Sequence, residues 1–297
     1  DLTVRDLNKE FVNKLVERGA NSGRSPKEMA EHCDVMITCL PSPKVCSEVM
    51  ESKDGVLAGL SKGKIWLEMS TTDEAEIRRI GALVDAVGAL PIDCPVSGGC
   101  HRADTGNISI FAGCTREAFE LALPILTTMG RRVLHTGDLG TASKLKVMTN
   151  YLATVNLTSI AEALTTMKAL GMDMNVTYEA IKASSGNSFV HETESQVILN
   201  GSRDISFTMD LVSKDVGIFN ELAKRKGLDL EIAPLIVDIF KDGEKRYGPR
   251  EFSPNIIKRL EERANVEVLG KGFPPEIIDN EPEETGYEVV IKGRQDY

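Results

Sequence analysis

Strand-like and helix-like segments alternate through the first half of the chain. Leu2 to Asp6 is typical of a strand, a buried-strand pattern follows at residues 35–40, and further strands are expected at residues 64–69, 90–94, 108–112 and 132–135. Helical patterns lie between them at residues 9–18, 43–50, 73–87 and 116–129, and Ser25 followed by Pro26 indicates the start of another helix. Because consecutive parallel strands need right-handed crossover connections, this order predicts a mostly parallel sheet covered on both faces.

The pattern changes after Gly137, where helical segments follow one another. Residues 141–170 are apolar at helical spacing for about eight turns, which is long for a globular helix and typical of one that joins two domains. Further helices are expected at residues 176–183, 207–226, 231–241 and 253–264. We therefore expect an α/β domain over residues 1–136, an all-α domain over residues 137–264, and an acidic, proline-containing tail of uncertain order over residues 265–297.

Composition places the chain among folded proteins and argues against several partners. Its 297 residues are 41% hydrophobic and 27% charged, an ordinary globular balance. The net charge of −10, with no basic block, argues against nucleic acid or an anionic membrane as a partner. No apolar run approaches the roughly 18 residues of a membrane span, and the first residues lack a signal-peptide pattern. We expect a cytoplasmic protein, with the mitochondrial matrix as the alternative.

The six cysteines indicate neither a disulfide framework nor a metal site. They include no C-x-x-C pair, and all lie before residue 115. Cys100 and His101 follow Cys94 closely, but the spacing is wrong for a structural zinc site. We therefore expect no metal.

An α/β domain followed by a helical domain suggests a dinucleotide at the carboxyl ends of the strands. The fingerprint G-x-G-x-x-G is absent from the chain. Asp6 nevertheless lies where an acidic residue would bind the adenosine ribose if one strand and one glycine-rich turn preceded it. A helix cap or a turn explains Asp6 equally well.

A second candidate is the segment Ser97-Gly98-Gly99, which follows a strand. Two adjacent glycines let the backbone approach a ligand closely, and their N–H groups with a serine hydroxyl can bind a carboxylate. The alternative is an ordinary tight turn.

The third candidate is the start of the long helix. Lys146 and Asn150 are four residues apart and share one helix face, whereas Lys144 lies on another. A lysine among apolar residues can serve as a general acid or base; the alternative is a solvated lysine. Lys214 and Asp215 also lie within an apolar helix, and because they are adjacent we expect them to serve separate partners.

Taken in this order, the segments resemble the β-hydroxyacid dehydrogenase family, most closely 3-hydroxyisobutyrate dehydrogenases and tartronate semialdehyde reductases. Asp93, Pro95 to Gly99, Ala103 and Gly106 match the family's substrate loop, D-x-P-V-S-G-G-x-x-x-A-x-x-G. Gly137, Gly140, Lys146 and Asn150 match its active-site pattern, from which Ala142 and Thr149 depart. The resemblance runs from residue 2 to about residue 264 and begins after the family's first strand and glycine-rich turn, so the sequence is expected to be N-terminally incomplete.

The resemblance implies a Rossmann-like NAD-binding domain, a helical domain and a dehydrogenase mechanism. Lys146 would be the general acid or base and Asn150 its catalytic partner, while Ser97, Gly98 and Gly99 would bind the carboxylate of a small substrate. The implied cofactor-binding residues are Asp6, Leu40, Pro41, Thr71 and Lys214. An acidic Asp6 implies NAD, although Arg5 keeps NADP as an alternative. The family also implies a homodimer or homotetramer.

Several other functions remain open at the level of sequence. One is a tartronate or succinic semialdehyde-type reductase that uses NADPH. A 6-phosphogluconate dehydrogenase shares the Lys-x-x-x-Asn spacing but needs a phosphate site rich in Arg and Lys, and imine-reducing relatives usually lack the lysine. A non-catalytic dimerising scaffold of the same fold is favoured by the missing G-x-G-x-x-G and opposed by Lys146, Asn150 and the Ser-Gly-Gly segment together.

Overall fold

The computed structural model describes residues 1–294, which form two compact units. The sheet unit comprises residues 1–97, 109–146 and 285–294, and the helical unit comprises residues 98–108 and 147–284. Each unit has its own hydrophobic core, so each is described by itself.

The sheet unit contains two sheets. The smaller pairs β1 (Thr3–Val4) with β2 (Asn21–Ser22) in parallel. The seven-stranded sheet consists of β3 (Val35–Thr38), β4 (Ile65–Glu68), β5 (Leu90–Asp93), β7 (Ser109–Gly113), β8 (Arg132–Gly137) and β9 (Tyr287–Glu288) in that order, with β6 (Val96–Ser97) beside β7. All pairs are parallel except those of β7 with β5 and β6, which confirms the expected mostly parallel sheet.

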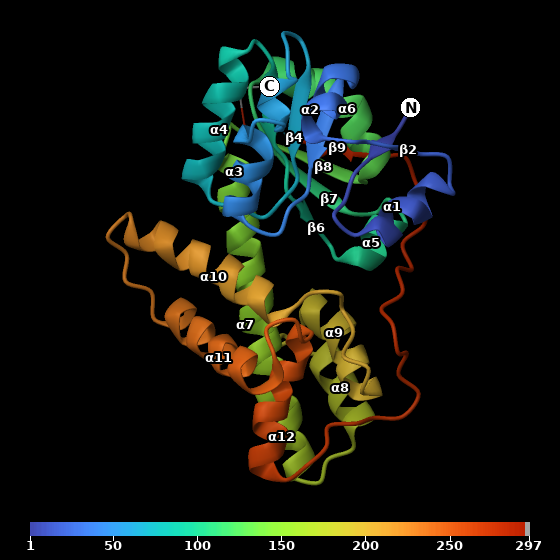
Figure 1. The fold of residues 1–297 in the computed structure, drawn as a ribbon. Coiled ribbons are helices and arrows are strands. Elements are labelled where there is room, and N and C mark those ends of the chain that lie inside the picture. The colour runs from blue at the N-terminus through green and yellow to red at the C-terminus, as the bar shows by residue number, and fades with distance from the viewer. Residues whose placement is uncertain (295–297) are drawn as a thin grey trace. The chain divides into compact units, whose positions relative to one another are not determined.

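Capped helices connect these strands (Figure 1). They are α1 (Lys9–Val16), α2 (Pro26–His32), α3 (Pro43–Glu51), α4 (Glu74–Ala86) and α6 (Arg116–Met129), with the 3-10 turn η1 (Val56–Ala58) before β4. Each α-helix begins after an Asn, Ser, Asp or Thr whose side chain accepts a hydrogen bond from the first turn, as Ser25 does from the N–H of Glu28. Trp66 of β4 packs beside Ile77 and Ile80 of α4 in the core, and all three are almost fully buried.

The helical unit is built around α7 (Thr141–Ala169), whose first residues belong to the sheet unit. The other helices are α5 (Cys100–Asp104), α8 (Met174–Lys182), α9 (Phe189–Asn200), α10 (Met209–Lys224), α11 (Ile232–Tyr247), the 3-10 turn η2 (Ser253–Ile257) and α12 (Lys258–Ala264). Leu164 of α7, Val216 of α10 and Phe240 of α11 are fully buried in its core. A helical second domain was expected, although α5 and α9 were not.

The segment after α12 is ordered by contacts that its composition does not reveal. Within it, β9 pairs with β8. The N–H of Tyr287 donates to the carbonyl of Arg131, and the N–H of Val289 donates to the carbonyl of Val133. Arg116 on α6 binds Glu288 through both terminal guanidinium nitrogens, at 2.6 and 3.0 Å. A short strand and a bidentate ion pair therefore hold residues 287–289 against the sheet unit, although their acidic composition is typical of a solvated tail.

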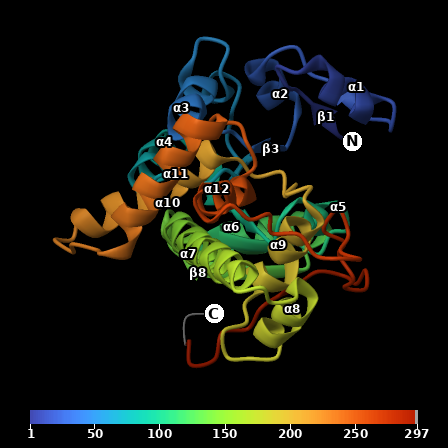
Figure 2. The same cartoon turned by 90° about the horizontal axis from the view of Figure 1, so that it is seen from below.

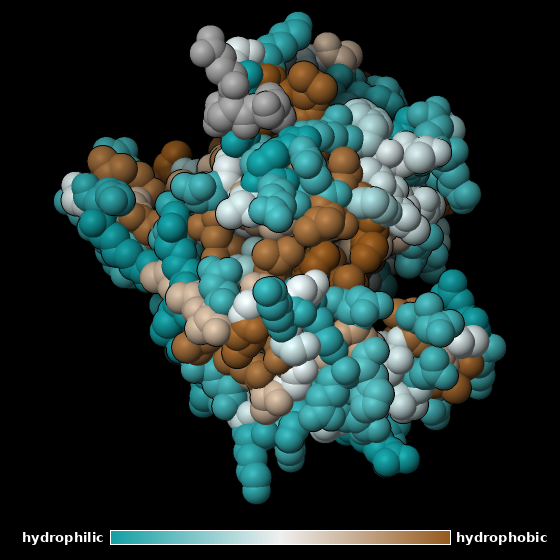
Figure 3. Space-filling view, turned by 90° about the horizontal axis from the view of Figure 1, so that it is seen from above, coloured by the Kyte–Doolittle hydropathy of each residue, from teal (hydrophilic) through white to brown (hydrophobic). Residues whose placement is uncertain are grey.

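Hydrophobic side chains reach the surface among hydrophilic ones, as the brown areas of Figure 3 show. None of the six cysteines is joined in a disulfide. Across residues 1–294, no helix has the length and apolar character that crossing a membrane would require.

Candidate active site

The loops that follow β3 and β4 are joined by a hydrogen-bond network. The backbone N–H of Leu40 donates to Ser70 Oγ at 2.7 Å, and the N–H of Ser70 donates to Glu68 Oε1 at 2.8 Å. Thr38 Oγ1 donates to the other oxygen of Glu68 at 2.8 Å. Burial raises the pKa of Glu68, although these hydrogen bonds lower it. The network fixes the ends of two adjacent parallel strands.

Three of the expected cofactor residues lie in these loops. Leu40 and Pro41 follow β3, and Thr71 follows β4; Leu40 and Thr71 are half-buried and Pro41 is exposed. The structure therefore brings these three together at the carboxyl ends of adjacent strands, where open α/β sheets bind ligands.

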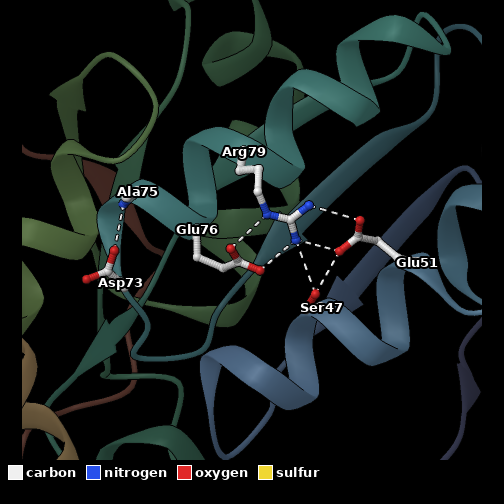
Figure 4. Close-up of polar contacts among 6 residues, drawn as sticks. All are labelled: Ser47, Glu51, Asp73, Ala75, Glu76 and Arg79. Carbon is white, nitrogen blue, oxygen red and sulfur yellow. Dashed lines mark hydrogen bonds and ion pairs between the residues drawn. The ribbon is translucent and has the colours of Figure 1, made fainter.

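An ion-pair network joins the two helices that begin at these loops (Figure 4). Arg79 on α4 donates from Nη1 to Glu51 at 2.9 Å and from Nη2 to Ser47 at 3.1 Å, both on α3. Its Nε also donates to Glu76 at 2.9 Å. The hydrogen bond from Arg79, aided by Ser47, lowers the pKa of Glu51 to about 2. Arg79 thus holds α3 against α4, and with them the loops from which they start.

Asp6 is not part of this network. It is exposed, and its Oδ1 accepts the N–H of Asn8, the N-cap residue of α1, at 2.7 Å. The neighbouring Arg5 donates from Nη1 to the carbonyl of Arg24 at 2.7 Å. Asp6 therefore stabilises a turn, which is one of the alternatives given for it from the sequence. Because its carboxylate is exposed, it can also accept hydrogen bonds from a ligand.

The start of α7 is anchored by a buried carboxyl group at the end of β5. Asp93 Oδ2 accepts the N–H of Ser143 at 2.8 Å, and Oδ1 accepts its hydroxyl at 2.7 Å. Asp93 is fully buried and lies in register with Glu68 on β4. Burial raises the pKa of Asp93 to about 7, and the charge of Glu68 raises it too, although the bonds from Ser143 lower it. This anchor lies three residues before Lys146.

The two lysines at the start of α7 have different surroundings. Lys146 is only 8% exposed, whereas Lys144 is exposed and pairs with Glu74 at 3.1 Å. Lys146 is therefore not the solvated lysine that the sequence left open. Asn150 follows it by one turn on the same face of α7.

The Ser-Gly-Gly segment connects β6 to α5. Ser97 pairs with Ser109 of β7, and the chain then turns through Gly98 at φ +134° and Gly99 at φ +87°. These φ values favour glycine, and a Cβ on Gly99 would lie 2.9 Å from the His101 ring. The backbone here is held in a form that side-chain-bearing residues rarely adopt.

In the helical unit, α7 and α10 meet through a polar contact. Asn150 Nδ2 donates to Asp215 Oδ2 at 2.6 Å, and the ring of Tyr151 stacks on Phe219 with centroids 4.5 Å apart. Lys214 Nζ lies 2.9 Å from Asp215 Oδ1, so the expectation that these adjacent charges serve separate partners is wrong. Asp215 is 1% exposed, and it accepts a hydrogen bond from Asn150 through Oδ2 while its Oδ1 forms the ion pair with Lys214.

Sequence reasoning missed the role of Asp215 as the partner of Asn150. The two residues are separated by 65 positions, so spacing gives no signal. The one available clue was an aspartate on the apolar side of α10, because a buried carboxylate needs hydrogen-bond donors.

Two family models match consecutive parts of the chain. Residues 1–137 match the NAD binding domain of 6-phosphogluconate dehydrogenase, and residues 140–260 match the model described as NAD-binding of NADP-dependent 3-hydroxyisobutyrate dehydrogenase. The 2-(hydroxymethyl)glutarate dehydrogenase of Eubacterium barkeri is 30% identical over 266 residues, covering 89% of this chain and 88% of that protein. The chain belongs to the β-hydroxyacid dehydrogenase family. It is thus an oxidoreductase that acts on hydroxy acids with NAD or NADP and binds small carboxylate substrates.

Other similar proteins agree with this assignment. The NAD-dependent L-serine dehydrogenase of Pseudomonas aeruginosa is 32% identical over 267 residues, covering 87% of this β-hydroxyacid dehydrogenase and 89% of that protein. The crystal structure of 3-hydroxyisobutyrate dehydrogenase from Salmonella typhimurium superposes with a TM-score of 0.79 at 26% identity, covering 86% of this chain and 90% of that one. The family, fold class and enzyme class expected from the sequence are confirmed.

The chemistry of the sheet unit of this β-hydroxyacid dehydrogenase fits a dinucleotide. The loops at Leu40 and Thr71 meet at the carboxyl ends of β3 and β4, and Asp6 carries an exposed carboxylate, a group that can accept hydrogen bonds from ribose hydroxyls. Within residues 1–294, no group of three or more His, Cys, Asp or Glu side chains is placed to hold a metal ion.

Proposed function

We propose that this β-hydroxyacid dehydrogenase interconverts a small 3-hydroxy acid and its semialdehyde or keto acid, as 3-hydroxyisobutyrate dehydrogenases do, with NAD as the preferred cofactor. The observation that carries the proposal is Lys146, buried on α7 one turn before Asn150, whose amide is held by Asp215. A buried lysine next to a fixed amide is suited to exchanging a proton with a substrate hydroxyl.

Each residue has one task in this reaction. Lys146 takes the hydroxyl proton during oxidation and returns it during reduction, and Asn150 orients the substrate oxygen toward Lys146. Ser97, Gly98 and Gly99 bind the substrate carboxylate and so fix which hydrogen is transferred. A nicotinamide cofactor held by the sheet unit would supply the acceptor or donor of the hydride.

Residues 1–136 would hold the cofactor, through Asp6, Leu40, Pro41 and Thr71, with Lys214 contributed by α10. The preference for NAD rests on Asp6, because a carboxylate repels the 2′-phosphate of NADP. Arg5, which would favour NADP, already donates a hydrogen bond to the Arg24 carbonyl. A tartronate or succinic semialdehyde-type reductase that uses NADPH is the alternative within the family.

A homodimer or homotetramer is part of the proposal. Leu152 on α7 is 50% exposed and Leu235 on α11 is 57% exposed, and apolar side chains of this size on helix surfaces favour association.

Two measurements test the function. Turnover is screened with 3-hydroxyisobutyrate, serine, glycerate and other small 3-hydroxy acids, each with NAD and with NADP. Binding of NADH is followed separately through energy transfer from the single Trp66, which is fully buried in β4. Turnover with NAD supports the proposal, and turnover of a semialdehyde with NADPH alone supports the alternative. A folded protein with neither turnover nor NADH binding would contradict the proposal.

A further inference from the structure

A long irregular segment ends the helical unit and runs past α8 toward α5 (Figure 1). We call residues 266–284 the C-terminal strap. Its first part is fixed to α8, to α9 and to the turn after α9 by hydrogen bonds to strap carbonyls. The donors are the side chains of Asn175, Asn200 and Ser202, and the acceptors are the carbonyls of Lys271, Phe273 and Pro275. The Phe273 ring also packs edge-on against Tyr178, with centroids 5.1 Å apart. The strap thus has a defined path.

The second part of the strap reaches the substrate loop, residues 98–108. Asp279 Oδ2 accepts hydrogen bonds from Asn107 Nδ2 at 2.7 Å and Thr105 Oγ1 at 2.5 Å. Glu281 Oε1 pairs with Arg102 Nη2 at 2.7 Å, and its carbonyl accepts Asn107 Nδ2 at 3.1 Å. Figure 2 shows α5, which forms the middle of this loop, beside the strap.

The substrate loop needs such support because its own backbone is permissive. Gly98, Gly99 and Gly106 all have positive φ, and glycine loses more conformational freedom than any other residue when it is fixed. Between these glycines, α5 is a five-residue helix without a side-chain cap. Contacts from more than 170 positions away therefore supply the order that the loop lacks locally.

Charge and geometry suit Asp279 and Glu281 to this task. Asp279 also accepts the N–H of Glu281 at 3.1 Å, so the end of the strap is itself turned and fixed. Burial opposes ionisation, yet the bonds from Thr105 and Asn107 lower the pKa of Asp279 to about 2, so it is a carboxylate at neutral pH. Glu281 holds the Arg102 guanidinium, which also lies 4.7 Å over the Phe189 ring.

We propose that Asp279 and Glu281 are positioning residues for substrate binding: they hold residues 98–108 so that Gly98 and Gly99 present their N–H groups to the substrate carboxylate. The inference rests on the proposed function. It assigns the strap a role in affinity for the acid, because Asp279 and Glu281 bond to Thr105, Asn107 and Arg102 of the segment that also contains Gly98 and Gly99. Loss of either contact therefore raises KM for the acid more than it changes kcat.

The test compares Asp279→Asn and Glu281→Gln with Glu283→Gln. Glu283 lies on the same strap and is exposed, and its change to Gln removes one negative charge, as each of the other two substitutions does. The readouts are KM and kcat for the acid, the Kd of NADH, and hydrogen–deuterium exchange of peptides that cover residues 98–108. We expect KM to rise about tenfold in Asp279→Asn and Glu281→Gln, since each replaces a charged acceptor of the loop's hydrogen bonds by a neutral amide, with exchange faster in the loop. The Kd of NADH should be unchanged, Glu283→Gln should match the wild type, and Glu281→Asp should recover part of the affinity.

Three results would overturn the inference: unchanged loop exchange in both variants, faster exchange with an unchanged KM, or an equal rise in KM in Glu283→Gln. If the wild-type protein turns over none of the acids, the proposed function fails instead. Loop exchange then still decides whether the strap holds residues 98–108, because it needs no substrate.

Discussion

Asn150 and Asp215 join α7 to α10 through a hydrogen bond of 2.6 Å, one turn beyond Lys146. Asp215→Ala removes the acceptor that fixes the Asn150 amide, and we expect kcat to fall about 10- to 100-fold because the substrate oxygen is then poorly oriented. Asp215→Asn keeps an acceptor for Asn150 but loses the charge that pairs with Lys214. Its kcat should therefore lie between that of the wild type and that of Asp215→Ala. Steady-state kinetics with a thermal melt for each variant check this, and a wild-type kcat in Asp215→Ala would contradict it.

Removal of the proposed acid or base should affect turnover alone. In Lys146→Ala, kcat is expected to fall about 10²- to 10⁴-fold, while the Kd of NADH stays close to the wild-type value. Lys144→Ala is the matched control, because Lys144 lies two residues away but is exposed and pairs with Glu74. Wild-type turnover in Lys146→Ala, or an equal loss in Lys144→Ala, would reject the assignment.

The cofactor preference should depend on Asp6. Without its carboxylate, Asp6→Ala no longer repels a 2′-phosphate, and the ratio of kcat/KM for NAD to that for NADP should fall about tenfold. Glu10→Gln, which removes an exposed charge from the adjacent helix α1, should leave the ratio as it is. An unaltered ratio in Asp6→Ala would exclude Asp6 as the ribose ligand.

Arg79 should stabilise the sheet unit moderately. Its contacts to Glu51 and Glu76 join α3 and α4, but its side chain is 45% exposed, so Arg79→Ala is expected to lower the free energy of unfolding by about 1 kcal/mol at pH 7. The paired state lowers the pKa of Glu51 to about 2, so this stability is present above the ordinary pKa of 4.5 and is lost as the pH falls toward 2. Urea unfolding of the wild type and of Arg79→Ala, at pH 7 and again as the pH is lowered toward 2, measures this contribution. Lys44→Ala, which breaks an exposed pair on α3, should cost less; equal losses would refute the bridging role.

The sequence predicts elements well where periodicity and caps agree. The expected helix at residues 141–170 is α7, Thr141–Ala169, and the N-cap at Ser25 is present. Helix α9 was missed because its buried face includes His191 and Ser195, which interrupt the apolar pattern. Strand β9 has two residues, and its pairing with β8 depends on a partner about 150 positions earlier.

The candidate site divides in the same way. The i, i+4 spacing within one helix indicates that Lys146 and Asn150 share a face, and the glycine pair indicates the turn at Gly98 and Gly99. The bond from Asn150 to Asp215 and the contacts of Asp279 depend on which segments pack together, and local pattern carries no information about that.

The anchor between Asp93 and Ser143 predicts a pH-dependent stability. Burial raises the pKa of Asp93 from 3.8 to about 7, so between these values the folded state keeps a proton that the unfolded state has released. Stability from this group is therefore full below about pH 4 and declines as the pH rises to 7, by at most about 4 kcal/mol. The raised pKa of Glu68 acts in the same direction.

Asp93→Asn keeps an acceptor for the Ser143 N–H and a donor for its hydroxyl but cannot titrate, so the decline in the free energy of unfolding between pH 4.5 and 7.5 should become shallower. Asp54→Asn, at an exposed position of the same unit, should leave the slope of the free energy of unfolding against pH unchanged. A wild-type slope in Asp93→Asn would show that the Asp93 carboxyl group is ionised throughout this pH range and would contradict the prediction.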